Sequence, residues 1–190
     1  RPVRRVLFVV AAVLVAALFG RGGGELRPSA QGCDPALQNE IVCENLQPGA
    51  PTSEWEVTGA GDASIQGFAT DISVNRGSTV RFKIDTNASA YRIDIYRLGF
   101  YGGMGARKVA TIDPSAALPQ NQPNCLSSNA TGLVDCGNWG ISASWAVPAD
   151  AVSGLYLARP VRTDTGGASH IPFVVRDDTG GSELLFQTSD

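Results

Sequence analysis

The sequence predicts an all-β protein: an antiparallel β-sandwich of the immunoglobulin or fibronectin type, preceded by an export signal. From about Glu54 onward, apolar and polar residues alternate in short segments separated by turn residues, which is the period of half-buried strands. No stretch after the N-terminal region has a convincing amphipathic helical pattern. Seven or eight short strands with Gly- and Pro-rich connections suit two packed sheets.

The expected strands follow one another through the second half of the chain. Residues 68–74 and 80–84 alternate on either side of a turn at 75–78, so we expect an antiparallel pair with one face in water. Residues 91–98 continue the alternation, with Tyr91, Ile93 and Ile95 on one side. Further strands are expected at 106–112, 143–147, 154–161, 171–176 and 183–187.

Two residues refine this expectation. Trp145 would make a good core residue between the sheets. Pro160 cannot donate a backbone hydrogen bond, so its strand is expected at a sheet edge or with a bulge there.

The first 30 residues differ from the rest. They hold five Arg against one Glu, and an unbroken apolar run covers residues 6–19. A basic stretch followed by an apolar run is typical of an export signal, which predicts a secreted protein. The alternative is a retained membrane anchor, although fourteen apolar residues fall short of the roughly 20 needed to cross a bilayer. Only a retained segment would give membrane contact.

The expected organisation therefore has four parts. Residues 1–30 form the signal peptide or anchor, and residues 31–53 form a lead-in segment stapled by a disulfide. Residues 54–177 form the sandwich, and residues 178–190 form a linker with the first strand of a further domain that the chain does not include.

The four cysteines fall into two close pairs, Cys33 with Cys43 and Cys125 with Cys136. Local disulfides are the natural pairing, although three connectivities are possible. Oxidised cysteines agree with export. A four-thiolate zinc site is disfavoured because its ligand pairs normally lie two to four residues apart. The polar segment 113–138 is expected to form a surface loop pinned by the second pair, and such loops often carry binding sites.

Charge and composition exclude several classes of function. Residues 31–190 carry ten basic and seventeen acidic side chains, a net charge of −7, which disfavours a nucleic-acid partner. His170 is the only histidine, and we expect it to be structural. We expect no catalytic, cofactor-binding or metal-binding residue in this chain, and the sequence leaves open whether it has enzymatic activity.

Two triplets, Asp164-Thr-Gly166 and Asp178-Thr-Gly180, match the aspartic-protease motif, in which paired carboxylates activate water. Their lead-ins are polar and Asp-Thr-Gly-Gly is good turn chemistry, so we interpret both as turns. An autonomous hydrolase that uses Asp164 and Asp178 is the weakest functional hypothesis.

Aromatic residues gather near the glycine-rich segment 99–108. This segment fits no phosphate-binding motif and is expected to be a bend between strands. Tyr96, Phe100 and Tyr101 form a possible binding or docking surface, because rings that face outward can stack on a sugar or pack against a neighbouring domain. Docking on a domain is favoured.

Several stretches of the sequence stand out together: Glu44-Asn45 with Pro48-Gly49, Ser53-Glu-Trp-Glu-Val57, Ile65-Gln-Gly-Phe-Ala-Thr-Asp71 and the segments 91–107 and 166–176. These stretches resemble the N-terminal part of secreted actinobacterial proteins related to the N,N-dimethylformamidase β subunit. The resemblance implies a sandwich that precedes a larger α/β domain, and 184–190 resembles the first strand of that domain. It also implies an iron site in that domain, so no catalytic residue is carried over.

The leading hypothesis is therefore a secreted, non-catalytic accessory domain that packs against a downstream catalytic domain. The alternative is a stand-alone module that binds carbohydrate or a cell-surface partner through the 113–138 loop and outward aromatic residues, with a glycan as the possible ligand.

Overall fold

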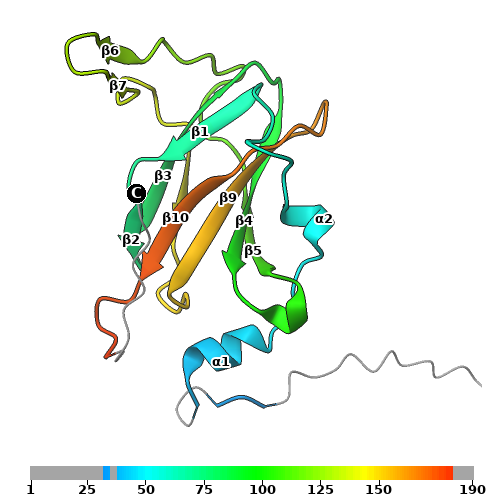
Figure 1. Cartoon of the computed structure of the whole chain (residues 1–190). Coiled ribbons are helices and arrows are strands. Elements are labelled where there is room, and N and C mark those ends of the chain that lie inside the picture. Colours follow the sequence, from blue (N-terminus) through cyan, green and yellow to red (C-terminus); the bar gives the residue numbers. More distant parts are fainter. Residues whose placement is uncertain (1–31, 35–37, 182–190) are drawn as a thin grey trace, which may run out of the picture. The chain divides into compact units, whose positions relative to one another are not determined.

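The computed structural model describes residues 32–34 and 38–181 (Figure 1). The chain divides into two units, Arg1–Gly32 and Cys33–Asp190, and the account below concerns the second. The expected signal at 1–30 and the expected strand at 183–187 lie outside the described residues. Within the described part of the chain, every helix is too short or too polar to span a bilayer.

Within residues 38–181, ten strands build three sheets. A three-stranded sheet has the order β1-β3-β8, a five-stranded sheet has the order β2-β10-β9-β4-β5, and β6 pairs with β7 in a separate hairpin. The strands are β1 (Ile65–Ala69), β2 (Ser73–Asn75), β3 (Thr79–Thr86), β4 (Tyr91–Leu98), β5 (Ala106–Ile112), β6 (Leu126–Ser128), β7 (Leu133–Asp135), β8 (Ala143–Ala146), β9 (Gly154–Arg162) and β10 (Ile171–Arg176). The predicted all-β sandwich is confirmed.

Among the described residues, helical structure is confined to short pieces. They are α1 (Glu40–Asn45), α2 (Thr52–Trp55) and the 3₁₀ turn η1 (Tyr101–Gly103). Each spans less than two turns, too short for an amphipathic period to stand out in the sequence. The glycine-rich segment between β4 and β5 is a bend, as predicted, with η1 at its centre.

The core lies between the two larger sheets and is centred on aromatic side chains. Phe173 of β10 packs against Phe82 of β3 and Trp145 of β8, with ring centroids 5.7 and 6.1 Å apart. Tyr156 of β9 completes the group at 5.7 Å from Phe173. All four side chains are buried. Trp145 is therefore an inter-sheet core residue, as predicted.

The first predicted strand divides into two. Residues 65–69 form β1 and pair antiparallel with β3, whereas residues 73–75 form β2 and pair parallel with β10 in the opposite sheet. The chain changes sheets between β1 and β2. Ile72 lies in this connection and is exposed, although the alternation of the sequence predicts that it is buried. A crossover between sheets preserves the alternating pattern on either side, so the sequence alone does not reveal it.

The prediction for Pro160 is wrong as to the edge. Strand β9 lies inside the five-stranded sheet, between β10 and β4. The pairing with β10 ends at Ala158, opposite Ile171, and Pro160 lies beyond that end. Its carbonyl accepts a 3.4 Å hydrogen bond from Ser169, so its missing donor faces an irregular segment rather than a strand. A proline is tolerated where the regular ladder has stopped.

Both predicted disulfides are present, joining Cys33 to Cys43 and Cys125 to Cys136. The 113–138 segment is not a simple loop, since it contains the β6–β7 hairpin, and the second disulfide closes the base of that hairpin. The hairpin projects from the end of the sandwich opposite to α1 (Figure 1).

Replacing Phe173 by Ala should lower the free energy of unfolding by about 3–5 kcal/mol, because the cavity would open at the contact between the sheets. Phe100→Ala is the matched control. Phe100 is 69% exposed, so its removal should change stability by no more than about 0.5 kcal/mol. Urea unfolding of both variants tests this, and equal losses would contradict the assignment of Phe173 as the centre of the core.

Candidate interaction site at the α1 end of the sandwich

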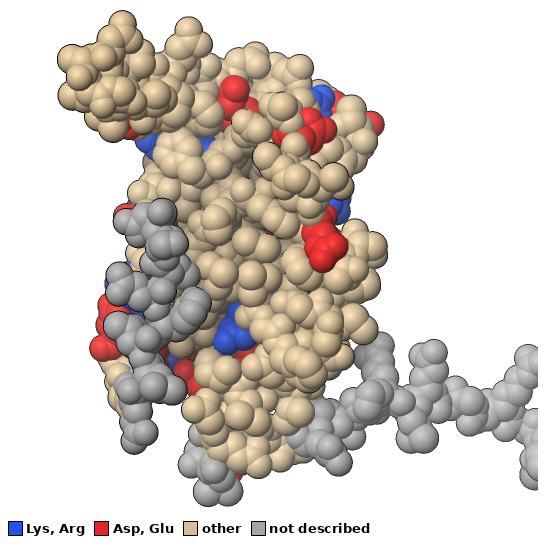
Figure 2. All heavy atoms as spheres, viewed as in Figure 1, with Lys and Arg blue, Asp and Glu red and all other residues tan. Residues whose placement is uncertain are grey.

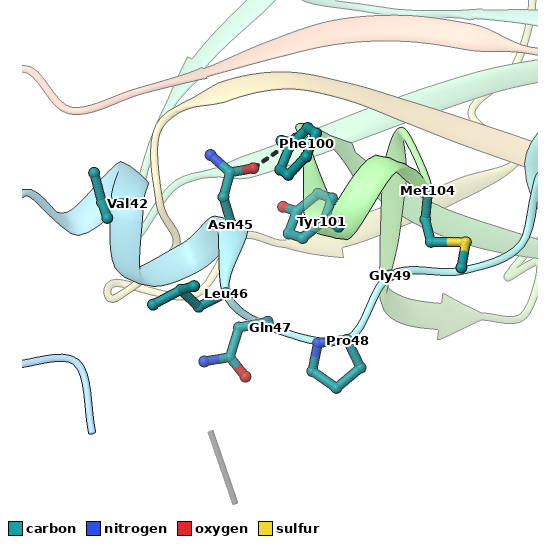
Figure 3. Close-up of a pocket in the computed structure, with 10 residues that line it drawn as sticks. Val42, Asn45, Leu46, Gln47, Pro48, Gly49, Phe100, Tyr101 and Met104 are labelled. Carbon is teal, nitrogen blue, oxygen red and sulfur yellow. Dashed lines mark hydrogen bonds between the residues drawn. The ribbon is translucent and has the colours of Figure 1, made fainter. Parts of the chain in front are cut away.

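An apolar groove of about 740 Å³ lies between α1 and the loop that joins β4 to β5 (Figure 3). Its apolar lining includes four strongly exposed side chains: Phe100 is 69% exposed, Val42 54%, Leu46 53% and Met104 45%. On the face shown in Figure 2, most of the surface near α1 is neither acidic nor basic. Large apolar side chains that gather in one exposed place are typical of an interaction surface.

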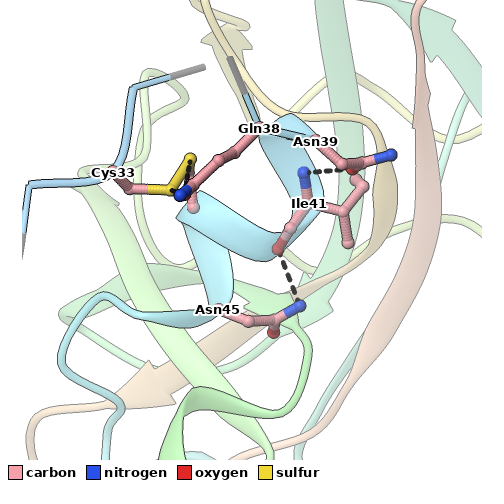
Figure 4. The surroundings of a disulfide bond; sticks show 6 residues. Cys33, Gln38, Asn39, Ile41 and Asn45 are labelled. Atoms are coloured by element: carbon pink, nitrogen blue, oxygen red, sulfur yellow. Dashed lines mark hydrogen bonds between the residues drawn. A yellow bond between two sulfur atoms is a disulfide. The ribbon is translucent and has the colours of Figure 1, made fainter. Parts of the chain in front are cut away.

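Local interactions fix α1, which forms one wall of the groove (Figure 4). Asn39 caps the helix, because its side-chain oxygen accepts a 2.8 Å hydrogen bond from the amide of Ile41. The disulfide between Cys33 and Cys43 ties the helix to the preceding segment. At the other end of α1, the Asn45 side-chain amide donates to the carbonyl of Ile41 at 2.9 Å.

The second wall is attached to the first through Asn45. The side-chain oxygen of Asn45 accepts a 2.6 Å hydrogen bond from the amide of Phe100 (Figure 3). Gly99 allows this approach, since a Cβ at that position would lie 2.5 Å from the same oxygen. Trp55 of α2 supports the loop from another side by donating from its indole nitrogen to the carbonyl of Met104 at 3.2 Å. The groove is thus a fixed feature.

A buried polar cluster lies beneath the groove. One carboxylate oxygen of Glu44 accepts from the Tyr101 hydroxyl at 2.8 Å and from Arg107, at 2.8 Å from Nε and 2.6 Å from Nη2. Arg97 donates from Nη1 to the Tyr101 hydroxyl at 3.0 Å, and its other nitrogens reach the carbonyls of Val152 and Ser153. Glu44, Tyr101 and Arg97 are all buried. Every member has partners, as buried charges require.

The cluster shifts the pKa values of its members. Burial raises the pKa of the Tyr101 hydroxyl above its ordinary value, and the bond from Arg97 offsets only part of that rise. Burial lowers the pKa of Arg107, but its hydrogen bond and ion pair with Glu44 outweigh burial, so the net pKa is raised. Tyr101 therefore stays protonated and Arg107 stays charged, which fixes the hydrogen-bond directions in the cluster.

A second buried carboxylate, Asp94, lies on the outer face of the five-stranded sheet. It is 1% exposed and accepts hydrogen bonds from Thr111 and Lys108, both at 2.7 Å, and from Arg92 at 3.1 Å. Burial raises its pKa, but the bonds from Lys108 and Thr111 and the nearby positive charges outweigh burial. The pKa of Asp94 consequently lies below its ordinary value.

Of the three aromatic residues predicted as a docking surface, only Phe100 is exposed. Tyr96 and Tyr101 are 1% and 2% exposed. The Tyr96 hydroxyl donates to the carbonyl of Glu54 at 2.9 Å, and the Tyr101 hydroxyl belongs to the buried cluster. Neither ring can present a face to a ligand, because lead-in residues cover both. A binding role stays a prediction for Phe100 alone.

The two Asp-Thr-Gly triplets do not come together. Asp164 follows the end of β9 and Asp178 follows the end of β10, and these neighbouring strands run antiparallel, so the two carboxylates lie at opposite ends of the sheet. Each carboxylate instead accepts two hydrogen bonds, from Nε and Nη2 of an arginine two residues earlier, Arg162 or Arg176. A shared proton is geometrically impossible, which contradicts the autonomous-hydrolase hypothesis.

His170 contacts the carbonyl of Trp55 through its Nε2 atom, a position that links α2 to the start of β10. Within residues 32–34 and 38–181, no group of three or more His, Cys, Asp or Glu side chains could hold a metal ion. Sequence reasoning missed Glu44, Arg97 and Arg107. The residues around a buried charge in a strand or short helix do not differ in sequence pattern from those around an exposed charge.

A family model described as N,N-dimethylformamidase beta subunit-like, C-terminal, matches residues 92–190, which is more than half of the chain. The matched region begins in β4 and includes β5 to β10. The expected place of these residues in the N-terminal part of such proteins stays a prediction. None of the curated proteins matches this chain.

Among solved structures, a crystal structure of a mutant of Salmonella alpha-2-macroglobulin is 17% identical over 69% of this chain, with a TM-score of 0.34. The match covers 7% of that much longer chain. A likeness this low carries no argument about function.

Changing Tyr101 to Phe should lower the free energy of unfolding by about 1–3 kcal/mol, because Glu44 and Arg97 each lose a partner in a buried place. Tyr156→Phe is the control. The Tyr156 hydroxyl makes one bond, to the carbonyl of Val152 at 2.7 Å, so its removal should cost less. Urea unfolding measures both, and an equal or smaller effect for Tyr101→Phe would contradict the role of the cluster.

Changing Asp94 to Asn should also lower stability at pH 7 by about 1–3 kcal/mol. The folded-state pKa of Asp94 lies below its unfolded value, so the stability from its charge is fully present above about pH 4 and is lost as pH falls through the folded pKa. The difference between wild type and variant should therefore shrink from about pH 4 downward. Unfolding at pH 7 and pH 3 tests this, with the exposed Asp71→Asn as control.

Proposed function

This chain belongs to the N,N-dimethylformamidase beta subunit-like family, and we propose that it supplies the exported, non-catalytic β-sandwich of a protein of that family. In this proposal the sandwich packs against a hydrolase domain. The observation that carries the proposal is the rigid apolar groove at the α1 end, where four large apolar side chains are exposed together.

The path of the chain supports this end as the docking surface. After β10 the chain continues beside α1, because Arg76 contacts Asp177 at 2.9 Å and Glu40 of α1 at 3.9 Å. The described residues end at 181, and Thr179 accepts a 3.4 Å hydrogen bond from Arg76, so this end of the chain stays close to the same point. The last described residues therefore lie at the same end of the sandwich as α1 and the groove (Figure 1).

The composition of the groove suits a contact between domains. Its exposed centre is apolar, whereas Asn45 and Gln47 supply polar groups among its lining residues. An apolar centre with a polar rim is the usual arrangement of a protein interface. Contacts between domains of one chain cover about 600–1,500 Å². A groove lined by ten residues would be the centre of such a contact, and surrounding residues would supply the rest.

Export is supported by two independent features. Both disulfides join cysteines close in sequence, and disulfides persist in oxidising compartments outside the cytosol. The basic and apolar residues in 1–30 have the composition of a secretion signal.

The test uses the natural secreted product that contains this sandwich, with Leu46 and Phe100 both changed to Asp. Docked domains unfold together, so we expect the single thermal transition of the wild type to separate into two. Leu133→Asp with Val134→Asp is the matched control, because these side chains are 63% and 66% exposed at the opposite end, and it should keep one transition.

Two outcomes would count against the proposal. One is a calorimetric profile in which the groove variant behaves like the hairpin variant. The other is a secreted product no larger than the 19.9 kDa of this chain, measured as an intact mass in the culture medium.

A further inference from the structure

The outer face of the five-stranded sheet carries a group of cations that the docking proposal does not use. Arg92 and Asp94 project from β4 on the face opposite to Ile93 and Ile95, which lie in the core between the sheets. Arg159 of β9 is directly opposite Asp94 in the ladder, and Lys108 of β5 is opposite Tyr96. Cross-strand partners share a face, so the three cations surround one carboxylate.

Asp94 leaves Arg159 without a partner. Its two oxygens accept from Thr111, Lys108 and Arg92, and Arg159 makes no hydrogen bond or ion pair with any described residue. The Nε atom of Arg159 is buried and has no acceptor. Buried donors are almost always paired in folded proteins, so a guanidinium group beside a carboxylate that already accepts three hydrogen bonds has donors left for an added anion.

Further donors in the group are also free to bind. Arg92 donates to Asp94 only through Nε, which leaves its two terminal nitrogens available, and its side chain is 43% exposed. The Lys108 ammonium is bonded to Asp94, and its side chain is 36% exposed. Asp94 is therefore a buried floor, and the donors above it can be reached from solvent.

The local charge limits the ligand. Arg92, Lys108 and Arg159 contribute three positive charges, and Asp94 contributes one negative charge. Glu54 adds a second negative charge. Its backbone carbonyl accepts from the Tyr96 hydroxyl, and its carboxylate raises the pKa of that hydroxyl, which Arg92 and Arg159 lower. One positive charge remains. A monovalent anion would neutralise it, whereas a phosphate dianion would leave an excess of negative charge.

We propose that Arg159, with Arg92 and Lys108, forms a binding site for a small-molecule carboxylate on the outer face of the five-stranded sheet. A guanidinium group has two parallel N–H donors spaced to match the two oxygens of a carboxylate. The two terminal nitrogens of Arg159 would form such a pair, and Arg92 would contact the same ligand from the neighbouring strand.

The experiment is a titration of the full chain with sodium acetate, followed by NMR at constant ionic strength maintained with sodium chloride. The Nε–Hε signal of Arg159 should shift and saturate, and so should the backbone amides of Asp94 and Lys108. In Arg159→Gln the affinity read from those two amides should fall at least about tenfold, the loss expected for a charged hydrogen bond. Glu54→Gln should tighten binding, because it removes a competing carboxylate.

Two controls make the result decisive. Arg81→Gln removes an exposed arginine from β3 in the other sheet and should leave acetate affinity unchanged. Arg159→Lys keeps the charge without the paired donors and should bind more weakly than wild type, which gives a second variant if Arg159→Gln does not fold. Shifts that do not saturate, that chloride reproduces, or that persist with the same affinity in both Arg159 variants would overturn the proposal.

Discussion

The contact of Phe173 with aromatic rings from both sheets is the constraint on which the rest of the domain depends. It fixes the separation and the relative position of the sheets, because Phe82 and Trp145 approach it from one side and Tyr156 lies beside it. With the inner faces committed to this core, polar function is left to the outer face of the five-stranded sheet and to the ends of the strands. The groove and the cation group lie in those places.

The lead-in segment is part of the folded domain rather than a tether in front of it. Glu44 reaches beneath the groove to Tyr101 and Arg107, and Asn45 holds the loop after β4. Residues 50–56 cover part of the outer face of the sheet, where Ala50 pairs with Ala106 and the carbonyl of Glu54 accepts from Tyr96. Because these contacts are mostly polar and directional, they determine the shape of the surface more than they add to the core.

The sequence predicted the strands of the two larger sheets well because they have the two-residue period that a buried face requires. The β6–β7 hairpin was missed, since its strands have no buried face. The bounds of β5 and β10 and both disulfides agree with expectation, since alternation and cysteine spacing are local signals. The site was predicted poorly, because it depends on contacts distant in sequence. Tyr96 and Tyr101 were predicted to be exposed for docking, but residues from earlier in the chain cover them. Glu44 contacts Arg107 across 63 residues of sequence. Only Phe100 could be placed correctly as an exposed part of the site.

The parallel pairing of β2 with β10 has a mechanical consequence. Strand β10 lies between β2 and β9 and leads directly out of the sandwich, so a pull on the chain beyond residue 181 acts along the length of β10. Ladder hydrogen bonds run across that direction and resist together in shear, on both sides of the strand, instead of opening one after another. A domain attached beyond this point would be tethered through a strand that is paired on both sides.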